Sequence, residues 1–265
     1  MGLRPHLFRK CVIRDPRFIV ITGASSGIGT ALAQVYAAPG IRLALTGRDG
    51  ARLAAVAAAC RRAGAEVEAT SLDVTDAGAT EAWLGEIDRD RAVDLVIANA
   101  GISAGTAQGR EPAAQIRAIF AVNLEGVLNT VLPLLPALQA RRRGQVALMS
   151  SLASFRGFHG APAYSASKAA VRVWGEALRG DLTGSGVEVS VICPGYVASP
   201  MTKHNDFPLP LLLPAARAAD IIRRGLARGR PRIAFPWPVY VAAWLLGSLP
   251  PGLTDPLLTR LPKKR

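Results

Sequence analysis

Tyr164 and Lys168 stand four residues apart and are of types that can move a proton. Residues four apart share one face of a helix, so a helix here would hold the Lys168 ammonium near the Tyr164 phenol. A free tyrosine has a pKa of about 10 and is a poor acid or base at neutral pH. A nearby cation stabilises the phenolate and brings that pKa toward the working range. Taken alone, the pair also fits an ordinary amphipathic helix with a surface lysine.

A glycine-rich turn follows the first predicted strand, Phe18–Thr22, and opens a predicted helix at Gly29–Ala38. Glycine lets the chain turn sharply and lets backbone N–H groups approach a phosphate, while the helix N-terminus adds partial positive charge. The turn therefore predicts a pyrophosphate site, although its Gly-x3-Gly-x-Gly spacing differs from the commoner Gly-x-Gly-x-x-Gly. The residues expected to bind there are Gly23, Ser25, Ser26, Gly27, Ile28 and Gly29.

The end of the second predicted strand bears on the choice of dinucleotide. Arg42–Thr46 is followed by Gly47, Arg48 and Asp49. An acidic residue at this strand tip would bind the ribose 2′-hydroxyl of NAD, whereas an arginine suits the 2′-phosphate of NADP. Arg48 favours NADP, while Asp49, one position later, keeps NAD open. Arg48 also fits a solvated residue at the start of a helix.

The elements that must position these residues alternate along the chain. Short apolar runs separated by alanine- and leucine-rich stretches predict β-α-β units and a parallel sheet covered on both faces. Strands are predicted at Phe18–Thr22, Arg42–Thr46, Glu66–Ser71, Leu95–Ala98, Gln145–Ser150 and Glu188–Cys193, and helices at Gly29–Ala38, Asp49–Ala63 and Ala113–Ala140. Ser151 follows a strand directly, at the sheet edge where such folds bind ligands. We expect the α/β class, with a doubly wound parallel sheet in a single domain.

Composition narrows the class of protein. Half of the 265 residues are hydrophobic, so the chain can bury a large core and is not disordered. Three cysteines at no metal-like spacing exclude a disulfide scaffold, favour a reducing compartment and predict no metal site. The net charge of +13 favours an anionic partner or serves solubility alone. Because no nucleic-acid-binding motif is present, we expect no nucleic-acid partner.

Residues 1–16 form a basic extension without the apolar run of a secretion signal, so we expect a cytoplasmic protein. A catalytic domain is expected over residues 17–235, and an apolar and basic segment over 236–265.

Several separated motifs, taken together and in order, resemble the short-chain dehydrogenases/reductases. The resemblance covers about Arg17 to Met201 and rests on Thr22–Gly29, Leu72-Asp73-Val74, Asn99-Ala100-Gly101, Asn123, Ser151, Tyr164 with Lys168, and Pro194-Gly195. It implies a Rossmann fold and an oxidoreductase that moves a hydride between NADP, or NAD, and a carbonyl/alcohol pair. A non-catalytic nucleotide sensor or scaffold on the same fold is the alternative.

The resemblance also implies a role for each matching residue. Tyr164 is expected to be the general acid/base and Ser151 to polarise the substrate carbonyl. Lys168 is expected to lower the pKa of Tyr164 and hold the nicotinamide ribose, and Asn123 to hold a water that links Lys168 to solvent. Further cofactor contacts are implied for Tyr164 itself, for Asp73 and Val74 near the adenine, for Asn99, Ala100 and Gly101 at the floor, and for Pro194, Gly195, Val197 and Ser199 near the nicotinamide. Ser199 replaces a threonine common in the family but keeps a hydroxyl, and Ala98 replaces a common asparagine.

Partners follow from the same resemblance and from the apolar runs. In the family, helices equivalent to Ile116–Leu135 and Ala163–Leu178 pair across a twofold axis, which implies a homodimer or homotetramer. A lid is implied over about residues 200–216; its stretch 207–214 is rich in proline and leucine and favours a lipophilic substrate.

The C-terminal segment has no charged residue from Ile233 to Thr254 and leaves three interpretations open. Its large side chains could contact an anionic membrane surface peripherally, line the substrate pocket, or form an oligomer contact. The side chains assigned to the membrane interpretation are Trp237, Tyr240, Trp244, Leu245 and Leu246. Prolines divide the segment into pieces too short to span a bilayer.

Overall fold

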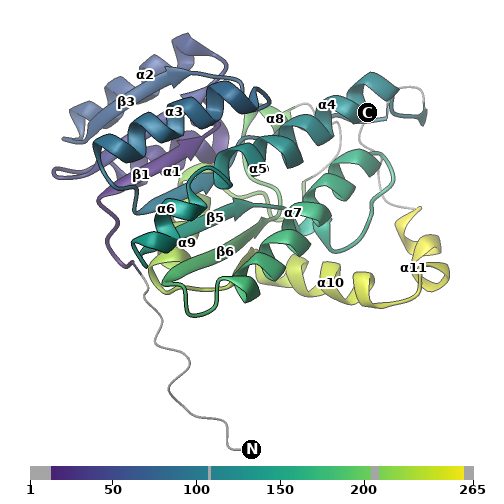
Figure 1. The fold of residues 1–265 in the computed structure, drawn as a ribbon. Coiled ribbons are helices and arrows are strands. Elements are labelled where there is room, and N and C mark those ends of the chain that lie inside the picture. The colour runs from purple at the N-terminus through teal and green to yellow at the C-terminus, as the bar shows by residue number, and fades with distance from the viewer. Residues whose placement is uncertain (1–12, 107–108, 204–208, 260–265) are drawn as a thin grey trace, which may run out of the picture.

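A seven-stranded parallel sheet forms the centre of the fold (Figure 1). The computed structural model describes residues 13–106, 109–203 and 209–259. The strands are β1 (Phe18–Thr22), β2 (Arg42–Gly47), β3 (Glu66–Ser71), β4 (Leu95–Ala98), β5 (Gly144–Met149), β6 (Val187–Pro194) and β7 (Arg232–Phe235). They lie in the order β3-β2-β1-β4-β5-β6-β7, and the order reverses between β1 and β4. At such a reversal the crossovers on its two sides go to opposite faces, which leaves a crevice at the carboxyl ends of the strands.

Helices cover both faces of the sheet. One layer holds α1 (Gly27–Tyr36), α2 (Gly50–Arg62) and α9 (Ala215–Ala227). The other holds α3 (Ala77–Asp90), α4 (Ala113–Phe120), α5 (Gly126–Val131), α6 (Leu135–Ala140) and α7 (Pro162–Asp181). Short elements complete the described chain: η2 (Ala121–Glu125), η3 (Leu152–Ser154), α8 (Pro200–Lys203), α10 (Trp237–Ser248) and α11 (Pro251–Leu258). The predicted doubly wound α/β fold is confirmed.

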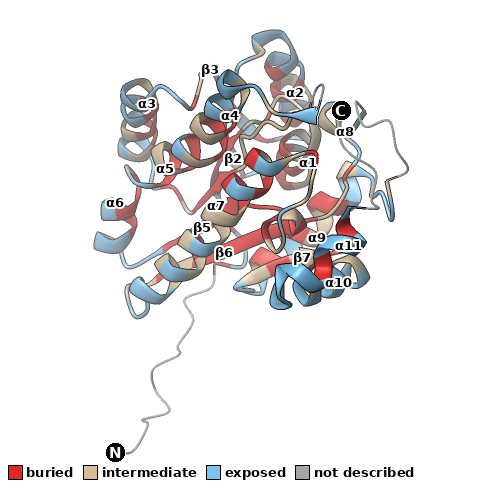
Figure 2. Cartoon of the chain, turned by 90° about the vertical axis from the view of Figure 1, so that its right-hand side faces the viewer, coloured by how far each residue is buried: buried red, intermediate tan, exposed pale blue. Residues whose placement is uncertain are grey.

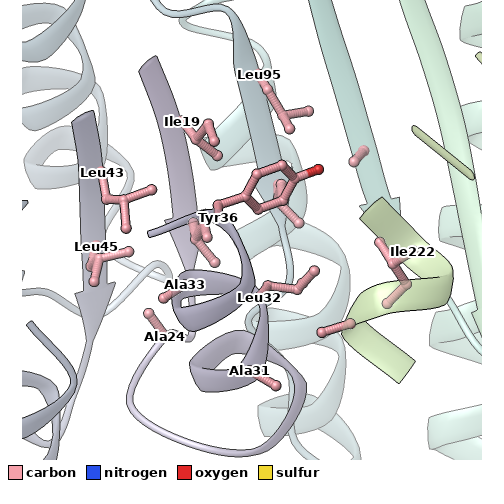
Figure 3. Packing of buried hydrophobic residues seen from close by; sticks show 14 of the residues in the cluster. Ile19, Ala24, Ala31, Leu32, Ala33, Tyr36, Leu43, Leu45, Leu95 and Ile222 are labelled. Carbon is pink, nitrogen blue, oxygen red and sulfur yellow. The ribbon is translucent and has the colours of Figure 1, made fainter. Parts of the chain in front are cut away.

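The core beneath α1 shows why these residues form these elements. Every residue of β1 is buried, as expected for a strand covered on both faces. Leu32 and Tyr36, four apart on α1, pack toward Ile19 of β1, and Ile222 of α9 closes the same cluster (Figure 3). Burial of each such aliphatic side chain contributes about 1.5–3 kcal/mol, so packing, more than helix propensity, fixes α1 over the crevice.

The long predicted helix Ala113–Ala140 is not continuous. A π-helical turn, η2, joins α4 to α5, and residues 132–134 form a turn before α6. Pro133 accounts for the second break, because proline lacks the N–H that a continuing helix needs. This region is the only described stretch long and apolar enough to cross a membrane, yet half of its most apolar window is buried. It is a core element of the sheet's second layer.

Strand β7 was not among the predicted strands. It has only four residues, and its buried positions alternate, unlike the continuous burial of β1 or β5. A short edge strand gives too little pattern to separate it from the uncharged segment that follows. Other boundaries differ by one or two residues; α1, for example, begins at Gly27 rather than Gly29.

Helix α10 is attached to the β7 edge through an ionic cluster. Arg232 of β7 pairs with Glu176 of α7 and donates a hydrogen bond of 3.1 Å to the Tyr240 hydroxyl. The Tyr240 ring meets Phe155 edge-on, with centroids 5.4 Å apart. Tyr240, assigned in the sequence to a membrane-facing surface, therefore faces the protein, because its hydroxyl and ring both have partners there.

Candidate active site

One cavity of about 1480 Å³ lies at the carboxyl ends of the central strands. It exceeds the ~300–1,000 Å³ usual for one small ligand and has room for a cofactor together with a substrate. All the predicted site residues except Gly29 and Asn123 line it. These are Gly23, Ser25, Ser26, Gly27, Ile28, Arg48, Asp73, Val74, Asn99, Ala100, Gly101, Ser151, Tyr164, Lys168, Pro194, Gly195, Val197 and Ser199.

The glycine-rich turn is shaped to leave its backbone open. Gly23 and Gly27 have φ angles of 66° and 56°, which favour glycine. A Cβ on Gly29 would lie 2.2 Å from the Gly23 carbonyl oxygen, so Gly29 lets helix and turn approach although it does not line the cavity. The turn passes into the ten-residue helix α1, whose N-terminus faces an anion favourably. These features fit the pyrophosphate of a dinucleotide.

Asn99 connects the end of β4 to this turn. Its side-chain amide donates to the carbonyls of Thr22 and Gly23 at 2.9 and 3.2 Å, and its backbone N–H donates to the Thr22 hydroxyl. A phosphate bound by the turn would accept hydrogen bonds and could not donate to these carbonyls. Asn99 supplies the donors that the carbonyls need.

The end of β2 presents a cation to the cavity. Arg48 is exposed and lines the cavity wall together with Ser25 of the turn. Asp49 is the N-cap of α2, where one carboxylate oxygen accepts from the Arg52 backbone and the other from the Arg52 guanidinium. These bonds hold the pKa of Asp49 below its usual range. Asp49 lines the same cavity, but both of its carboxylate oxygens already accept a hydrogen bond from Arg52.

Asp73 lies near this end of the cavity. Its carboxylate accepts from the backbone and the hydroxyl of Thr75 at 3.0 and 2.9 Å, which lowers its pKa, and Arg48 adds to the effect. Asp73 therefore forms a fixed rim beside Val74 and Arg48, in keeping with the predicted adenine contact.

Ser151 and Tyr164 meet at the centre of the cavity. Ser151 follows β5, and its hydroxyl oxygen accepts from Ala153 N at 3.1 Å, which fixes it at the start of η3. The Ser151 hydroxyl donates to the Pro194 carbonyl at 3.5 Å and lies close enough to the Tyr164 hydroxyl to act on its pKa. Burial raises the pKa of Tyr164, a hydrogen bond with Ser151 opposes that rise, and Tyr196 adds to it. Tyr164 is therefore protonated at neutral pH, the form that can give a proton to a substrate.

Lys168 lies one helical turn further along α7. Its Nζ donates to the Met149 carbonyl at 2.9 Å and lies 6.0 Å from the centroid of the Tyr164 ring. Burial lowers the pKa of Lys168 to about 8. Because the amine still carries its proton at neutral pH, two of its three donors are available to a ligand. The predicted lowering of the Tyr164 pKa by Lys168 stays a prediction.

Asn123 lies in the π-helical turn η2 and is fully buried. Its amide forms both hydrogen bonds with the Ile102 backbone, at 2.8 and 2.9 Å, and donates to the Ser167 hydroxyl at 3.0 Å. Three of its four side-chain hydrogen-bond positions are thus filled by protein. Asn123 therefore connects three elements: η2, the loop after β4, and α7. Because its side chain is engaged in these bonds, a water that links Lys168 to solvent would have to bind the backbone of Asn123.

The chain after β6, where the resemblance implies nicotinamide contacts, forms another part of the cavity wall. Gly195 N donates to the Phe235 carbonyl at 2.7 Å, and Val197 pairs with Leu213 as an isolated β-bridge. This bridge fastens the far end of the predicted lid, while Leu209 and Pro210 line the cavity. Phe207 and Pro208, also assigned to the lid, lie outside the described residues.

Part of the far wall of the cavity comes from the C-terminal segment, for which pocket lining was one of the three interpretations that the sequence left open, whereas its loop residues Phe158 and His159 were not predicted. Phe158 and His159, in the loop before α7, line it, and so do Val239, Ala242, Ala243 and Leu246 of α10. His159 Nε2 is buried with no hydrogen-bond partner among the described residues. Leu246 was placed on a membrane-facing surface; it lines the cavity instead, because α10 is apolar on all sides and its sequence alone gives no direction.

Comparisons agree with this geometry. Residues 17–207 match the family model for short chain dehydrogenases. The chain belongs to the short-chain dehydrogenase family. An "Uncharacterized oxidoreductase" of Myxococcus xanthus is 40% identical over 246 residues, which cover 92% of this chain and 97% of that protein.

Solved short-chain dehydrogenases share the fold. One from Burkholderia phymatum, in complex with NAD, has a TM-score of 0.81 and 26% identity, over 95% of this chain and 98% of that one. One from Sphingobium yanoikuyae, in complex with NADPH, has a TM-score of 0.77 and 26% identity, over 94% and 97%. This short-chain dehydrogenase is accordingly an oxidoreductase of a family that uses NAD or NADP.

Proposed function

We propose that this protein is an NADPH-dependent reductase of lipophilic carbonyl compounds. The observation that carries the proposal is that the Ser151–Tyr164 pair, the buried ammonium of Lys168 and the glycine-rich turn share one cavity whose far wall is apolar except for His159. A sensor without activity would have no need of this proton-donating set, so a catalytic role is favoured.

Each polar group has a task in such a reduction. When bound, NADPH supplies a hydride to the carbonyl carbon. Ser151 and Tyr164 donate hydrogen bonds to the carbonyl oxygen, and the Tyr164 proton moves to that oxygen as negative charge develops on it. Lys168 holds the ribose hydroxyls with its free donors and stabilises the phenolate left behind, which solvent then reprotonates.

Arg48 supports NADPH over NADH. Its guanidinium is exposed to the cavity, whereas Asp49, the residue that would favour NAD, is committed to its helix cap. A charge-assisted bond to the 2′-phosphate contributes about 1.5–3 kcal/mol, or about ten- to a hundredfold in preference. Arg48→Ala is therefore expected to raise KM for NADPH by about that factor and to leave KM for NADH nearly unchanged, in steady-state assays with each cofactor.

The matched control is Arg62→Ala, which removes an exposed arginine from the last turn of α2, away from the cavity. It is expected to behave as wild type with both cofactors. A wild-type enzyme that prefers NADH would show that Arg48 has been given the wrong role.

The far wall of the cavity supports a lipophilic substrate. Its α10 side chains and the lid residues Leu209 and Pro210 are apolar, so closure over them excludes water from the reacting carbonyl. Across a series of methyl ketones of increasing chain length, kcat/KM measured by NADPH absorbance is expected to rise about tenfold for every two buried methylene groups until the cavity is filled. A flat or falling series would contradict this substrate class.

We also propose a homodimer. Ile116 of α4 and Val173 of α7 are large apolar side chains exposed on helices that pack together. An isologous contact would cover both at once. Light scattering at micromolar concentration is expected to give about twice the 27.8 kDa chain mass; the mass of one chain would contradict the dimer.

Cys60 and Cys193 are buried free thiols, which supports a reducing, cytoplasmic compartment.

A further inference from the structure

Most of the exposed large apolar side chains of the described chain belong to its last 60 residues. Within residues 13–106, 109–203 and 209–259, only Ile116, Leu132 and Val173 are exposed on the α4–α7 side. All the others lie in the lid or on the last two helices: Leu211, Leu212, Trp237, Val241, Trp244, Leu245, Leu249, Leu253 and Leu257. We call this second group the C-terminal apolar face. Figure 2 shows the outer sides of α10 and α11 exposed along their length.

Helix α10 has an inner and an outer side that are equally apolar. Its inner side lines the cavity with Ala243 and Leu246, whereas Trp237 on its outer side is 73% exposed and Trp244 and Leu245 are each 49% exposed. A helix that is apolar all round is normally covered all round, by protein or by lipid. In the described fold the outer side of α10 has no cover.

We propose that the C-terminal apolar face docks on an anionic phospholipid bilayer and so places the substrate cavity directly beside it. The role of the cavity as a substrate site rests on the proposed reductase function, whereas the docking itself does not. Tryptophan and leucine are side chains that enter the boundary between headgroups and acyl chains, and the α10 wall would then separate the bilayer from the cavity by one helix.

Charge favours a bilayer over a second copy of the chain as the occupant. An anionic surface attracts a chain of net charge +13, and the dimer proposed above already places the second copy on α4 and α7. Exposed arginines Arg223, Arg224, Arg228 and Arg230 precede the uncharged segment in the sequence. Four basic residues stand among the six that follow Thr259, with no acidic residue. In the sequence, basic residues thus stand before and after the apolar segment, a pattern typical of chains that bind anionic membrane surfaces.

The attachment of α10 explains why insertion would not unfold the site. The Arg232–Glu176–Tyr240 cluster holds the first half of the helix, and the Arg156 guanidinium binds Asp255 of α11 at 2.6 Å. Near the end of α10, a Cβ on Gly247 would lie 2.1 Å from the Phe155 carbonyl oxygen, so this helix is in close contact with the loop before α7. The outer side chains can therefore enter lipid while the inner wall keeps its shape.

Vesicle flotation tests the docking without any turnover. The full chain is mixed at low ionic strength with vesicles of phosphatidylcholine alone or of phosphatidylcholine with phosphatidylglycerol. Wild type is expected to float with the anionic vesicles, and to do so much less at high salt or with neutral vesicles. Trp237→Ser/Trp244→Ser/Leu245→Ser, which changes only exposed side chains that do not line the cavity, is expected to lower the partition coefficient about tenfold or more.

The control Leu132→Ser removes a half-exposed leucine outside the C-terminal apolar face and is expected to keep wild-type flotation. Light scattering and reduction of a short, water-soluble ketone are measured on all variants. Wild type that stays with the soluble fraction, or a triple variant that floats as well as wild type, overturns the proposal. If wild type does not float and the triple variant forms a smaller oligomer than wild type, the face binds a second copy of the chain. That result also overturns the docking proposal. A triple variant that no longer floats but still reduces the soluble ketone supports the docking. If wild type floats but does not reduce the ketone, only the proposed reductase function is contradicted.

Discussion

Tyr164→Phe is expected to lower kcat for carbonyl reduction at least a hundredfold while the Kd for NADPH stays within about twofold of wild type. The substitution removes only the phenolic hydroxyl, which is hydrogen-bonded to Ser151 at the centre of the cavity. Tyr196 also lines the cavity and has a raised pKa, but Tyr164 is the tyrosine on which Ser151 acts and which stands one helical turn from Lys168. Turnover is read from NADPH absorbance and binding from cofactor fluorescence.

Tyr36→Phe is the matched control for the loss of a hydroxyl. Tyr36 is a buried tyrosine at the end of α1 that does not line the cavity, so its substitution is expected to leave kcat unchanged. More than a few per cent of wild-type turnover in Tyr164→Phe would show that another group donates the proton.

Lys168→Ala is expected to damage cofactor binding and turnover together. Lys168 is 3% exposed and donates to Met149 O within reach of Gly101, so its removal leaves both the ribose pocket and the phenolate without a cation. We expect kcat to fall about a hundredfold and KM for NADPH to rise about tenfold. Lys203→Ala, at an exposed lysine that does not line the cavity, is expected to match wild type.

The pH profile of the wild type gives a second readout of the same residue. Burial lowers the pKa of Lys168 to about 8, so the free enzyme loses this charge as pH rises through that value. The kcat/KM for NADPH, which reports the free enzyme, is therefore expected to fall above about pH 8 in wild type and to lose that limb in Lys168→Ala. Equal profiles in the two proteins would assign the limb to another group.

The glycine-rich turn was predictable because its signal is local. A buried strand, a turn that needs positive φ at Gly23 and Gly27, and a helix follow one another within 20 residues of chain, 17–36. Ser151, Tyr164 and Lys168 were predictable because their signals are local too. Ser151 follows the end of strand β5, and Tyr164 and Lys168 lie four residues apart on helix α7, which places them on one face.

The far wall of the cavity was not predictable from pattern. The α10 residues that line it, such as Ala243 and Leu246, come from a helix with no polar side to orient it. Its direction is fixed by the hydrogen bond of Tyr240 to Arg232, a contact between the helix and the edge strand β7, which was itself not predicted. The engaged amide of Asn123 has the same origin, because its partners Ile102 and Ser167 lie far away in sequence.

We propose that this cavity passes a hydride from NADPH to a lipophilic carbonyl, with Tyr164 as the proton donor. The most direct measurement uses NADPH that carries deuterium at the transferred position of the nicotinamide, a long-chain methyl ketone, and mass spectrometry of the product. The wild type is expected to yield the alcohol with one deuterium on the carbinol carbon, and Tyr164→Phe to yield almost none. Alcohol without deuterium, or labelled alcohol formed equally by both proteins, would contradict the claim.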